Sequence, residues 1–266
     1  MKRIRMLMVG LALVAAVAGF AAASAIKYGE PDNGRHPYVG LMVAQDANGK
    51  PLWRCSGTLI SPTVFLTAGH CTEQPAAHVE IWFDDDVDAG YPLNGYPYTG
   101  QASGTPYTHP QYDPAAFYLH DLGVVVLDSP VVMSEYGLLP TLNQLDALAR
   151  VRRNTGVTFT AVGYGLQRAF PGPVPETAMR VRMVAYPELV QINGGIAGTE
   201  SLVLSNNANT GGTCFGDSGG PNFLGNTRVI AGVTSFGLNG TCSGTGGVYR
   251  VDRADDLAWL ATFLSN

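Results

Sequence analysis

Short apolar runs rich in β-branched residues recur along the chain and constrain its fold more than any other feature. In the run 79–83, three apolar residues alternate with Glu80 and Trp82, the period of two that is typical of a half-buried strand. Gly 33 and Pro 17 together make 50 of the 266 residues, about 19%, which fits a turn-rich β protein better than a helix bundle. The pattern predicts an all-β sandwich or barrel. The expected strands cover residues 38–43, 58–60, 64–68, 79–83, 122–127, 157–162, 181–184, 202–204, 229–235 and 248–251.

The only convincing helix pattern lies at the C-terminal end of the chain. Leu257, Leu260, Ala261 and Leu264 recur at helical spacing, as expected of an amphipathic helix. Asp252 precedes this stretch and is a candidate N-cap. We expect the helix to pack on a barrel.

A transition between two β units is expected where the apolar periodicity weakens, between residues 128 and 155. Pro130, Pro140 and a basic cluster at 150–153 mark this crossing. We therefore predict an N-terminal barrel over 26–140, a linker over 141–155, and a C-terminal barrel with its helix over 156–266. The Gly- and Pro-rich stretches 88–106 and 169–175 are expected to be surface loops.

The first 25 residues have the pattern of a secretory signal peptide. Lys2, Arg3 and Arg5 precede the uncharged run 6–20, and an A-S-A site ends at residue 25. An uncleaved membrane anchor is the alternative, but the run is rich in Ala and Gly and a cleavage site follows it directly. We expect cleavage before Ile26 and a secreted protein, extracellular or periplasmic.

The charge balance argues against nucleic acid as a partner. The formal charge is -5, and removing the three leader cations gives -5 - 3 = -8 for the remainder. A chain of that charge repels a phosphate backbone.

Four cysteines are expected to form disulfides rather than a metal site. Cys55, Cys71, Cys214 and Cys242 allow three connectivities, and an oxidising compartment favours their oxidation. No C-x-x-C pair is present, which argues against a zinc cluster. Local pairing of Cys55 with Cys71 would close a loop of 15 intervening residues, for which chain entropy gives about 3 kcal/mol.

Three motifs occur in an order and spacing that carry chemistry. The chain reads T-A-G-H-C around His70, D-L-x-x-x-x-L from Asp121, and G-D-S-G-G-P around Ser218. Together they resemble the chymotrypsin-like (trypsin-fold) serine proteases, and the resemblance covers nearly all of residues 26–264. It implies two packed antiparallel six-stranded β-barrels with a C-terminal α-helix. It also implies that the four cysteines form two disulfides at positions where the family has them.

The resemblance implies a serine endopeptidase with a His70, Asp121 and Ser218 triad. A serine hydroxyl is a weak nucleophile until a base takes its proton, and imidazole titrates near neutrality. A buried carboxylate fixes the imidazole tautomer and stabilises the imidazolium. The N–H groups of Gly216 and Ser218 would form the oxyanion hole.

Two other functions are also compatible with parts of the sequence. The stretch Gly216 to Gly220 also matches the G-x-S-x-G pattern of α/β-hydrolases. That fold needs its His after the Ser, whereas the five histidines, at 36, 70, 78, 109 and 120, all precede Ser218. The second alternative is a catalytically silent binding protein on the same fold. His120 is not expected to be catalytic, and His36, His78 and His109 have no motif around them.

The resemblance also implies supporting and substrate-binding residues. Ser235 would hydrogen-bond the triad carboxylate, and 235–237 would pair with the substrate backbone. The side chain before the cleaved bond would enter a pocket that has Gly212 where trypsin-like members carry Asp, so large apolar side chains should be preferred to basic ones. The substrate-binding set is Gly212, Thr213, Ser235, Phe236, Gly237 and Gly247, with Phe236 standing where the family often has Trp.

An activation pair is expected between the new N-terminus and the residue before the nucleophile. I-K-Y-G from Ile26 looks like a diverged I-V-G-G start, whose ammonium would pair with Asp217. No cofactor or metal is expected, and the substrate is expected to be a protein or peptide bound by a monomer. The acidic run 84–88 is a weaker candidate for structural calcium, a solvated acidic turn being the favoured interpretation.

Overall fold

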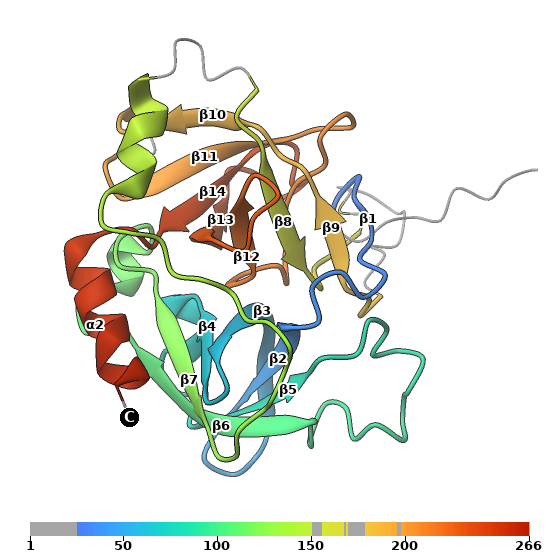
Figure 1. Ribbon diagram of the computed structural model, residues 1–266. Helices are drawn as coiled ribbons and strands as arrows, with labels where there is room; N and C mark the ends of the chain where they lie inside the picture. Colours follow the sequence, from blue (N-terminus) through green and yellow to red (C-terminus); the bar gives the residue numbers. More distant parts are fainter. Residues whose placement is uncertain (1–25, 151–155, 168, 170–178, 196–197, 266) are drawn as a thin grey trace, which may run out of the picture.

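The computed structural model describes residues 26–150, 156–167, 169, 179–195 and 198–265. Two β units lie one above the other, and a C-terminal helix runs along one side of the pair (Figure 1). The predicted signal peptide, 1–25, lies outside the described residues, as do 151–155 of the predicted linker. Within the described part, no helix is long and apolar enough to span a bilayer.

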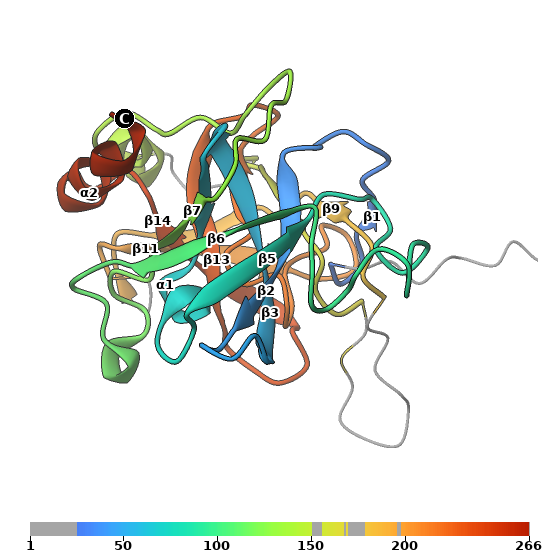
Figure 2. The ribbon, with the colours of Figure 1, turned by 90° about the horizontal axis from the view of Figure 1, so that it is seen from below.

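The first unit is a closed antiparallel barrel with the strand order β2-β3-β4-β7-β6-β5, seen from below in Figure 2. Close packing inside it requires glycine at Gly57, where a Cβ atom would lie 2.3 Å from the Phe65 ring. The strands are β2 (Val39–Gln45), β3 (Pro51–Ser61), β4 (Val64–Thr67), β5 (His78–Trp82), β6 (Ala102–Thr108) and β7 (Gly123–Leu127).

The second unit is an antiparallel sheet with the order β1-β9-β8-β12-β13-β14-β11-β10. Only residues 186–188 separate β9 from β10, and Pro187, which has no N–H, interrupts the strand there. β9 and β10 are therefore two parts of one bent stretch, and the edge strands of this sheet are β1 and β10. Its strands are β1 (Glu30–Pro31), β8 (Phe159–Gly163), β9 (Met183–Ala185), β10 (Leu189–Ile192), β11 (Ser201–Asn206), β12 (Pro221–Leu224), β13 (Ile230–Gly237) and β14 (Gly244–Arg250).

The predicted class, all-β with two packed barrels and a C-terminal helix, is confirmed. The loop predicted over 88–106 is wrong at its end, because β6 begins at Ala102. Gly104 and Pro106 indicate a loop by composition, but pairing with β5 and β7 overrides that local preference. The two-residue strand β1, which joins the N-terminal segment to β9, is too short to leave a sequence pattern. The boundaries at 140 and 155 remain a prediction.

The C-terminal helix α2 (Ala254–Leu264) is present, but only part of the predicted apolar face is buried. Trp259, Leu260 and Phe263 pack against the core, whereas Ala261 and Leu264 are exposed. Asp252 does not cap this helix. It is fully buried and its carboxylate accepts from the Leu145 N–H and pairs with Arg250. The other helical turns are α1 (Gly69–Thr72), η1 (Pro114–Ala116) and η2 (Gln144–Arg150).

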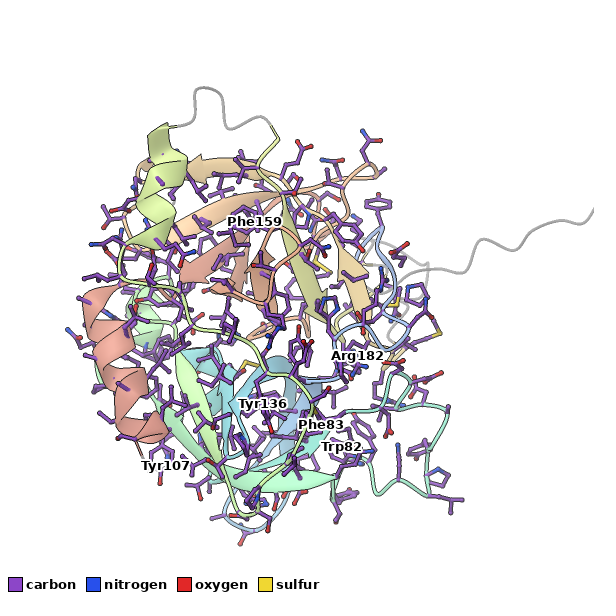
Figure 3. All side chains as sticks on the ribbon, viewed as in Figure 1. Trp82, Phe83, Tyr107, Tyr136, Phe159 and Arg182 are labelled. Atoms are coloured by element: carbon purple, nitrogen blue, oxygen red, sulfur yellow. A yellow bond between two sulfur atoms is a disulfide. The ribbon has the colours of Figure 1, made fainter. Side chains whose placement is uncertain are left out.

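One cluster of buried apolar side chains spans both units, with Phe65 and Val125 from the first and Phe223 and Val233 from the second. Beside it, the guanidinium of Arg182 is buried where the units meet (Figure 3). Its N–H groups donate to Asp32 at 2.9 Å, to the carbonyls of Val39 and Phe83 at 3.0 and 2.9 Å, and to Asp85. This single side chain therefore ties three segments of the first unit to β9.

Replacing Arg182 with Met is expected to lower the free energy of unfolding by about 3–5 kcal/mol, because the buried Asp32 carboxylate would lose the guanidinium and keep only His36 as an ion-pair partner. Urea denaturation followed by circular dichroism measures this. Arg35→Met is the matched control, since Arg35 is 40% exposed and its ion pair with Glu30 should contribute less than about 1 kcal/mol. Equal effects of the two substitutions would contradict the assignment.

Candidate active site

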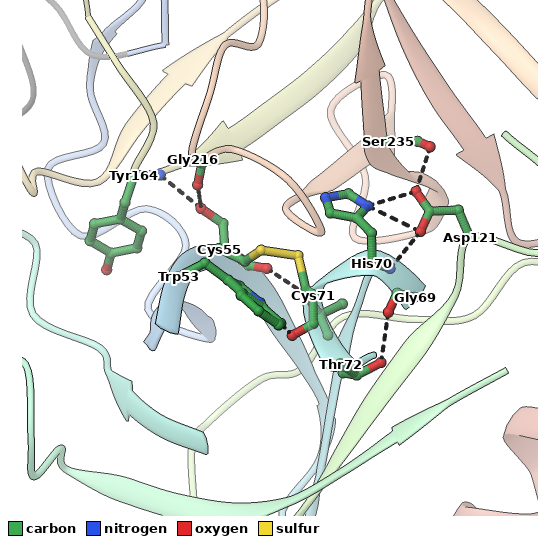
Figure 4. Close-up of a disulfide and its surroundings, with 12 residues drawn as sticks. Trp53, Cys55, Gly69, His70, Cys71, Thr72, Asp121, Tyr164, Gly216 and Ser235 are labelled. Atoms are coloured by element: carbon green, nitrogen blue, oxygen red, sulfur yellow. Dashed lines mark hydrogen bonds and ion pairs between the residues drawn. A yellow bond between two sulfur atoms is a disulfide. The ribbon is translucent and has the colours of Figure 1, made fainter. Parts of the chain in front are cut away.

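His70 is held at the end of β4 by a short helical turn and a disulfide (Figure 4). The disulfide between Cys55 and Cys71 connects α1 to β3, and it is the local pairing that the sequence suggested. The Trp53 indole N–H also donates to the Cys71 carbonyl at 3.0 Å. The backbone that carries His70 is therefore fixed on both sides. The second bridge joins Cys214 to Cys242, so both implied disulfides are present.

The carboxylate of Asp121 is fully buried and accepts hydrogen bonds from two other candidate residues. The Nδ1 atom of His70 lies 3.0 and 3.1 Å from its two oxygens, and the His70 backbone N–H donates to Oδ1 at 2.9 Å. The Ser235 hydroxyl donates to Oδ2. A carboxylate in this position holds the proton on Nδ1, which leaves Nε2 as the basic atom of the ring.

The pKa of His70 results from two opposing effects. Burial favours the neutral ring and lowers the pKa, whereas the negative charge of Asp121 and its hydrogen bond raise it. The second effect is the larger in sum, so the pKa of His70 lies above its ordinary value of 6.5.

Ser218 lies in a turn that only glycine can form at its flanks. Gly216 and Gly219 have φ of +94° and +76°, and a Cβ atom at Gly219 would lie 2.0 Å from the Thr67 hydroxyl oxygen. The Ser56 N–H donates to the Ser218 carbonyl, and the Ser56 hydroxyl donates to that of Gly216. These bonds fix the turn against β3. Among the described residues, none accepts a hydrogen bond from the N–H of Gly216 or Ser218.

Ser218 and Ser235 line one cavity of about 230 Å³. Thr213, Phe236 and Gly237 of the predicted substrate-binding set line it too, and its lining contains no charged side chain. Sequence reasoning missed Cys214, Phe215, Thr234 and Cys242, although the disulfide of Cys214 and Cys242 was a signal that could have placed this pair at the pocket.

Two residues of the predicted substrate-binding set lie behind the cavity wall. Gly247 is covered by the Phe236 ring, 2.3 Å from where its Cβ atom would be. The Gly212 N–H donates to the Lys27 carbonyl, and the space beside Gly212 is filled by Asn206. A direct contact of either glycine with substrate remains a prediction.

Asp217 is fully buried, and burial raises its pKa to about 7 in spite of hydrogen bonds from the N–H groups of Cys214 and Gly165. Ile26 is also fully buried and packs against Ala161 of β8. Farther along β8, a Cβ atom at Gly163 would lie 2.3 Å from the Asp217 carboxylate. The two members of the predicted activation pair thus lie near the same strand, and the pair itself remains a prediction.

The acidic run 84–88 makes internal contacts that do not suit calcium. The carboxylate of Asp85 pairs with Arg182, and that of Asp88 pairs with Arg180. The arginines beside these two carboxylates oppose a second cation there electrostatically. Calcium binding by the run 84–88 stays an untested prediction.

The sequence model of the family described as Trypsin matches residues 29–257. The chain belongs to the trypsin family. Two curated relatives are "Serine protease 7" of Drosophila melanogaster, 28% identical over 84% of this chain and 60% of its own length, and "Granzyme M" of Homo sapiens, 28% identical over 73% of this chain and 72% of its own. The "Venom serine protease Bi-VSP" of Bombus ignitus is 30% identical over 75% of this chain.

This chain spans 60% and 56% of the Drosophila and Bombus relatives, respectively. Among solved structures, HL collagenase matches with a TM-score of 0.66 at 20% identity, covering 91% of this chain and 99% of its own. A mutant of human heparin binding protein matches with a TM-score of 0.67 at 21% identity, covering 91% and 97%. These similarities show the shared fold.

Replacing Asp121 with Asn is expected to lower the pKa of His70 below 6.5, because burial would then act without the opposing negative charge. Histidine NMR titration measures the pKa directly. Ser235→Ala is the control, since it removes a hydrogen bond but keeps the charge, so the pKa should stay above 6.5. A His70 pKa in the Asn variant as high as in the parent would refute this electrostatic account.

Proposed function

We propose that the protein is a secreted serine endopeptidase that cleaves peptide bonds through an acyl-enzyme intermediate. The observation that carries the proposal is the network of His70, Asp121 and Ser235, which adjoins the cavity lined by Ser218. Membership of a family with protease relatives supports the same reaction. The alternative, a silent binding protein on the same fold, is not favoured, because the positions of His70, Asp121 and Ser218 all carry the residues that catalysis needs.

In the proposed reaction, the Ser218 hydroxyl attacks the carbonyl carbon of the substrate while Nε2 of His70 accepts its proton. Asp121 stabilises the imidazolium that forms. The oxyanion receives hydrogen bonds from the N–H groups of Gly216 and Ser218, which no described residue occupies. His70 then gives the proton to the leaving amine, and water attacks the acyl-enzyme by the same route in reverse.

The cavity favours an apolar side chain before the cleaved bond. Phe215 and Phe236 lie in its lining, and no carboxylate does. An Arg or Lys side chain would enter without a counter-ion, which is unfavourable for a buried cation. A Phe or Leu side chain would instead gain its burial free energy, about 1.5–3 kcal/mol at full burial.

Two disulfides within the described residues fit a protein of an oxidising compartment. Together with the leader pattern in 1–25, they support secretion. Cleavage before Ile26 would create an ammonium group close to the strand that contacts Asp217, and we propose that this pair orders the turn around Ser218. The protein is proposed to act as a monomer on protein or peptide substrates.

Ser218→Ala is expected to lower kcat on casein or a peptide ester by about 10⁴-fold or more, because the members of a catalytic triad act as one unit. Thermal unfolding should be unchanged, which separates loss of chemistry from loss of fold. Ser129→Ala changes an exposed serine outside the proposed site, so it serves as the control and should keep full activity. Turnover by the Ser218→Ala protein at the parent rate would disprove the assignment.

Matched peptides with Phe, Leu, Ala or Arg before the scissile bond test the cavity. We expect kcat/KM for Phe to exceed that for Arg by at least tenfold, since only the apolar side chain gains by burial. A higher kcat/KM for Arg than for Phe would show that an acid reaches the cavity and would overturn the specificity proposal while leaving the protease proposal intact.

A chain that begins at Ile26 is expected to be at least tenfold more active in kcat/KM than one that keeps Ala25. Asp217 is buried, and its pKa is raised to about 7 where Ile26 carries an amide. A free ammonium would hold it ionised and fix the turn. N-terminal sequencing of active protein accompanies the kinetics, and equal activity of both forms would rule the pair out.

A further inference from the structure

A second cluster of titratable side chains lies between helix α2 and the loop that precedes β7. It contains His109, His120 and Asp256, which sequence reasoning gave no role. The imidazole rings of His109 and His120 stack with their centroids 5.1 Å apart. Nε2 of His109 lies 3.7 Å from Oδ1 of Asp256. One candidate ligand atom from each of the three residues lies within 4.8 Å of the other two.

Two polar atoms of this cluster are buried without a hydrogen-bond partner among the described residues. They are Oδ1 of Asp256 and Nδ1 of His120. The other oxygen of Asp256 accepts from the Tyr249 hydroxyl at 2.9 Å, and the carboxyl group is fully buried. A buried carboxyl oxygen with no donor is unfavourable unless a ligand or a proton satisfies it.

The cluster is buried on the side that faces the core and is exposed to solvent on the opposite side. His109 is 3% exposed and contacts the edge of the Trp259 ring, whereas the His120 side chain is 21% exposed. His120 also lines a surface cavity of about 620 Å³ whose wall includes Asp146, Glu200 and Asp255. Asp146 and Glu200 form ion pairs with Arg250 and Arg253, which leaves the carboxylate of Asp255 beside His120 to attract a positive ion.

We propose that His109, His120 and Asp256 bind a divalent transition-metal ion of the zinc type. Two imidazoles and one carboxylate are a donor set for zinc, whereas calcium and magnesium prefer oxygen alone. The site is separate from the cavity lined by Ser218, so it does not depend on the proposed function.

Binding requires the side chains to move and at least one imidazole ring to rotate, because a metal lies in the plane of the ring that binds it and these two rings are stacked with only 8° between their planes. Ligand atoms about 2.0 Å from a tetrahedral zinc ion are about 3.3 Å apart, so the three residues must draw together by roughly 1 Å. The Gln111 N–H donates to Nδ1 of His109 at 3.3 Å. Zinc at Nε2 places the ring proton on Nδ1, and this long bond is lost. Asp255, whose Oδ2 lies 3.5 Å from Nδ1 of His120, or water, completes the coordination.

The ion would connect α2 to the segment that ends at Asp121. His120 directly precedes Asp121, and Asp256 belongs to α2. Because the three ligands come together only in the folded chain, zinc binds the native state in preference to the unfolded one and raises its stability.

The test is a calorimetric titration of Ser218→Ala protein, which avoids self-digestion, with zinc chloride, followed by thermal unfolding with and without the metal. We expect one zinc ion per chain with a Kd in the micromolar range or below, and a Tm raised by several degrees. Calcium chloride at the same concentration should leave the Tm unchanged. A folded protein that shows neither heat nor a Tm shift with zinc would overturn the proposal.

Variants locate the site. Asp256→Asn and His120→Gln should each weaken zinc binding at least tenfold. His70→Ala removes an accessible imidazole outside the proposed site and should bind zinc like its parent. Loss of binding in the His70→Ala protein, or unchanged binding in the first two, would place the metal elsewhere and refute the assignment. Because Asp256 is buried, circular dichroism is used to check that the Asp256→Asn protein is folded. If that protein is unfolded, the test relies on His120→Gln, since His120 is partly exposed.

Discussion

The buried carboxylate of Asp121 is the constraint on which the rest of the site depends. Its oxygens accept from His70 of the first barrel and from Ser235 of the second unit. A buried charge of this kind is stable only when both partners are in place. The two β units must therefore pack in one relative position, and in that position Ser235, which donates to the carboxylate, lines the same cavity as Ser218.

Other buried charges at the junction also fix the relative position of the two β units. Arg182, which directly precedes β9, reaches Asp32 and the carbonyls of Val39 and Phe83 in the first unit. These bonds lie away from the site, but each is satisfied only when the two sheets are packed as observed. The apolar cluster shared by both units supplies burial free energy, and the polar groups specify the orientation.

Where the sequence misled, a long-range contact had overridden a local preference. β6 contains Gly104 and Pro106, yet pairs with strands on both sides. In α2 the apolar spacing favoured a face with Ala261 and Leu264, but the docked face contains Asp256, Trp259 and Phe263. A carboxyl group on a buried helix face has no pattern in the sequence, because its partner Tyr249 lies on β14.

The sequence by itself determined the β class, the family and the identity of His70, Asp121 and Ser218 as candidates, because each stands in a short motif whose chemistry is local. It also indicated the Cys55 to Cys71 bridge, which closes a short loop. Only the tertiary structure decided which side chains line the cavity, how Asp217 is buried, and that His109 and His120 meet Asp256. Those contacts join residues far apart in the chain, and their geometry follows from the packing of the closed barrel against the second sheet, which no local pattern encodes.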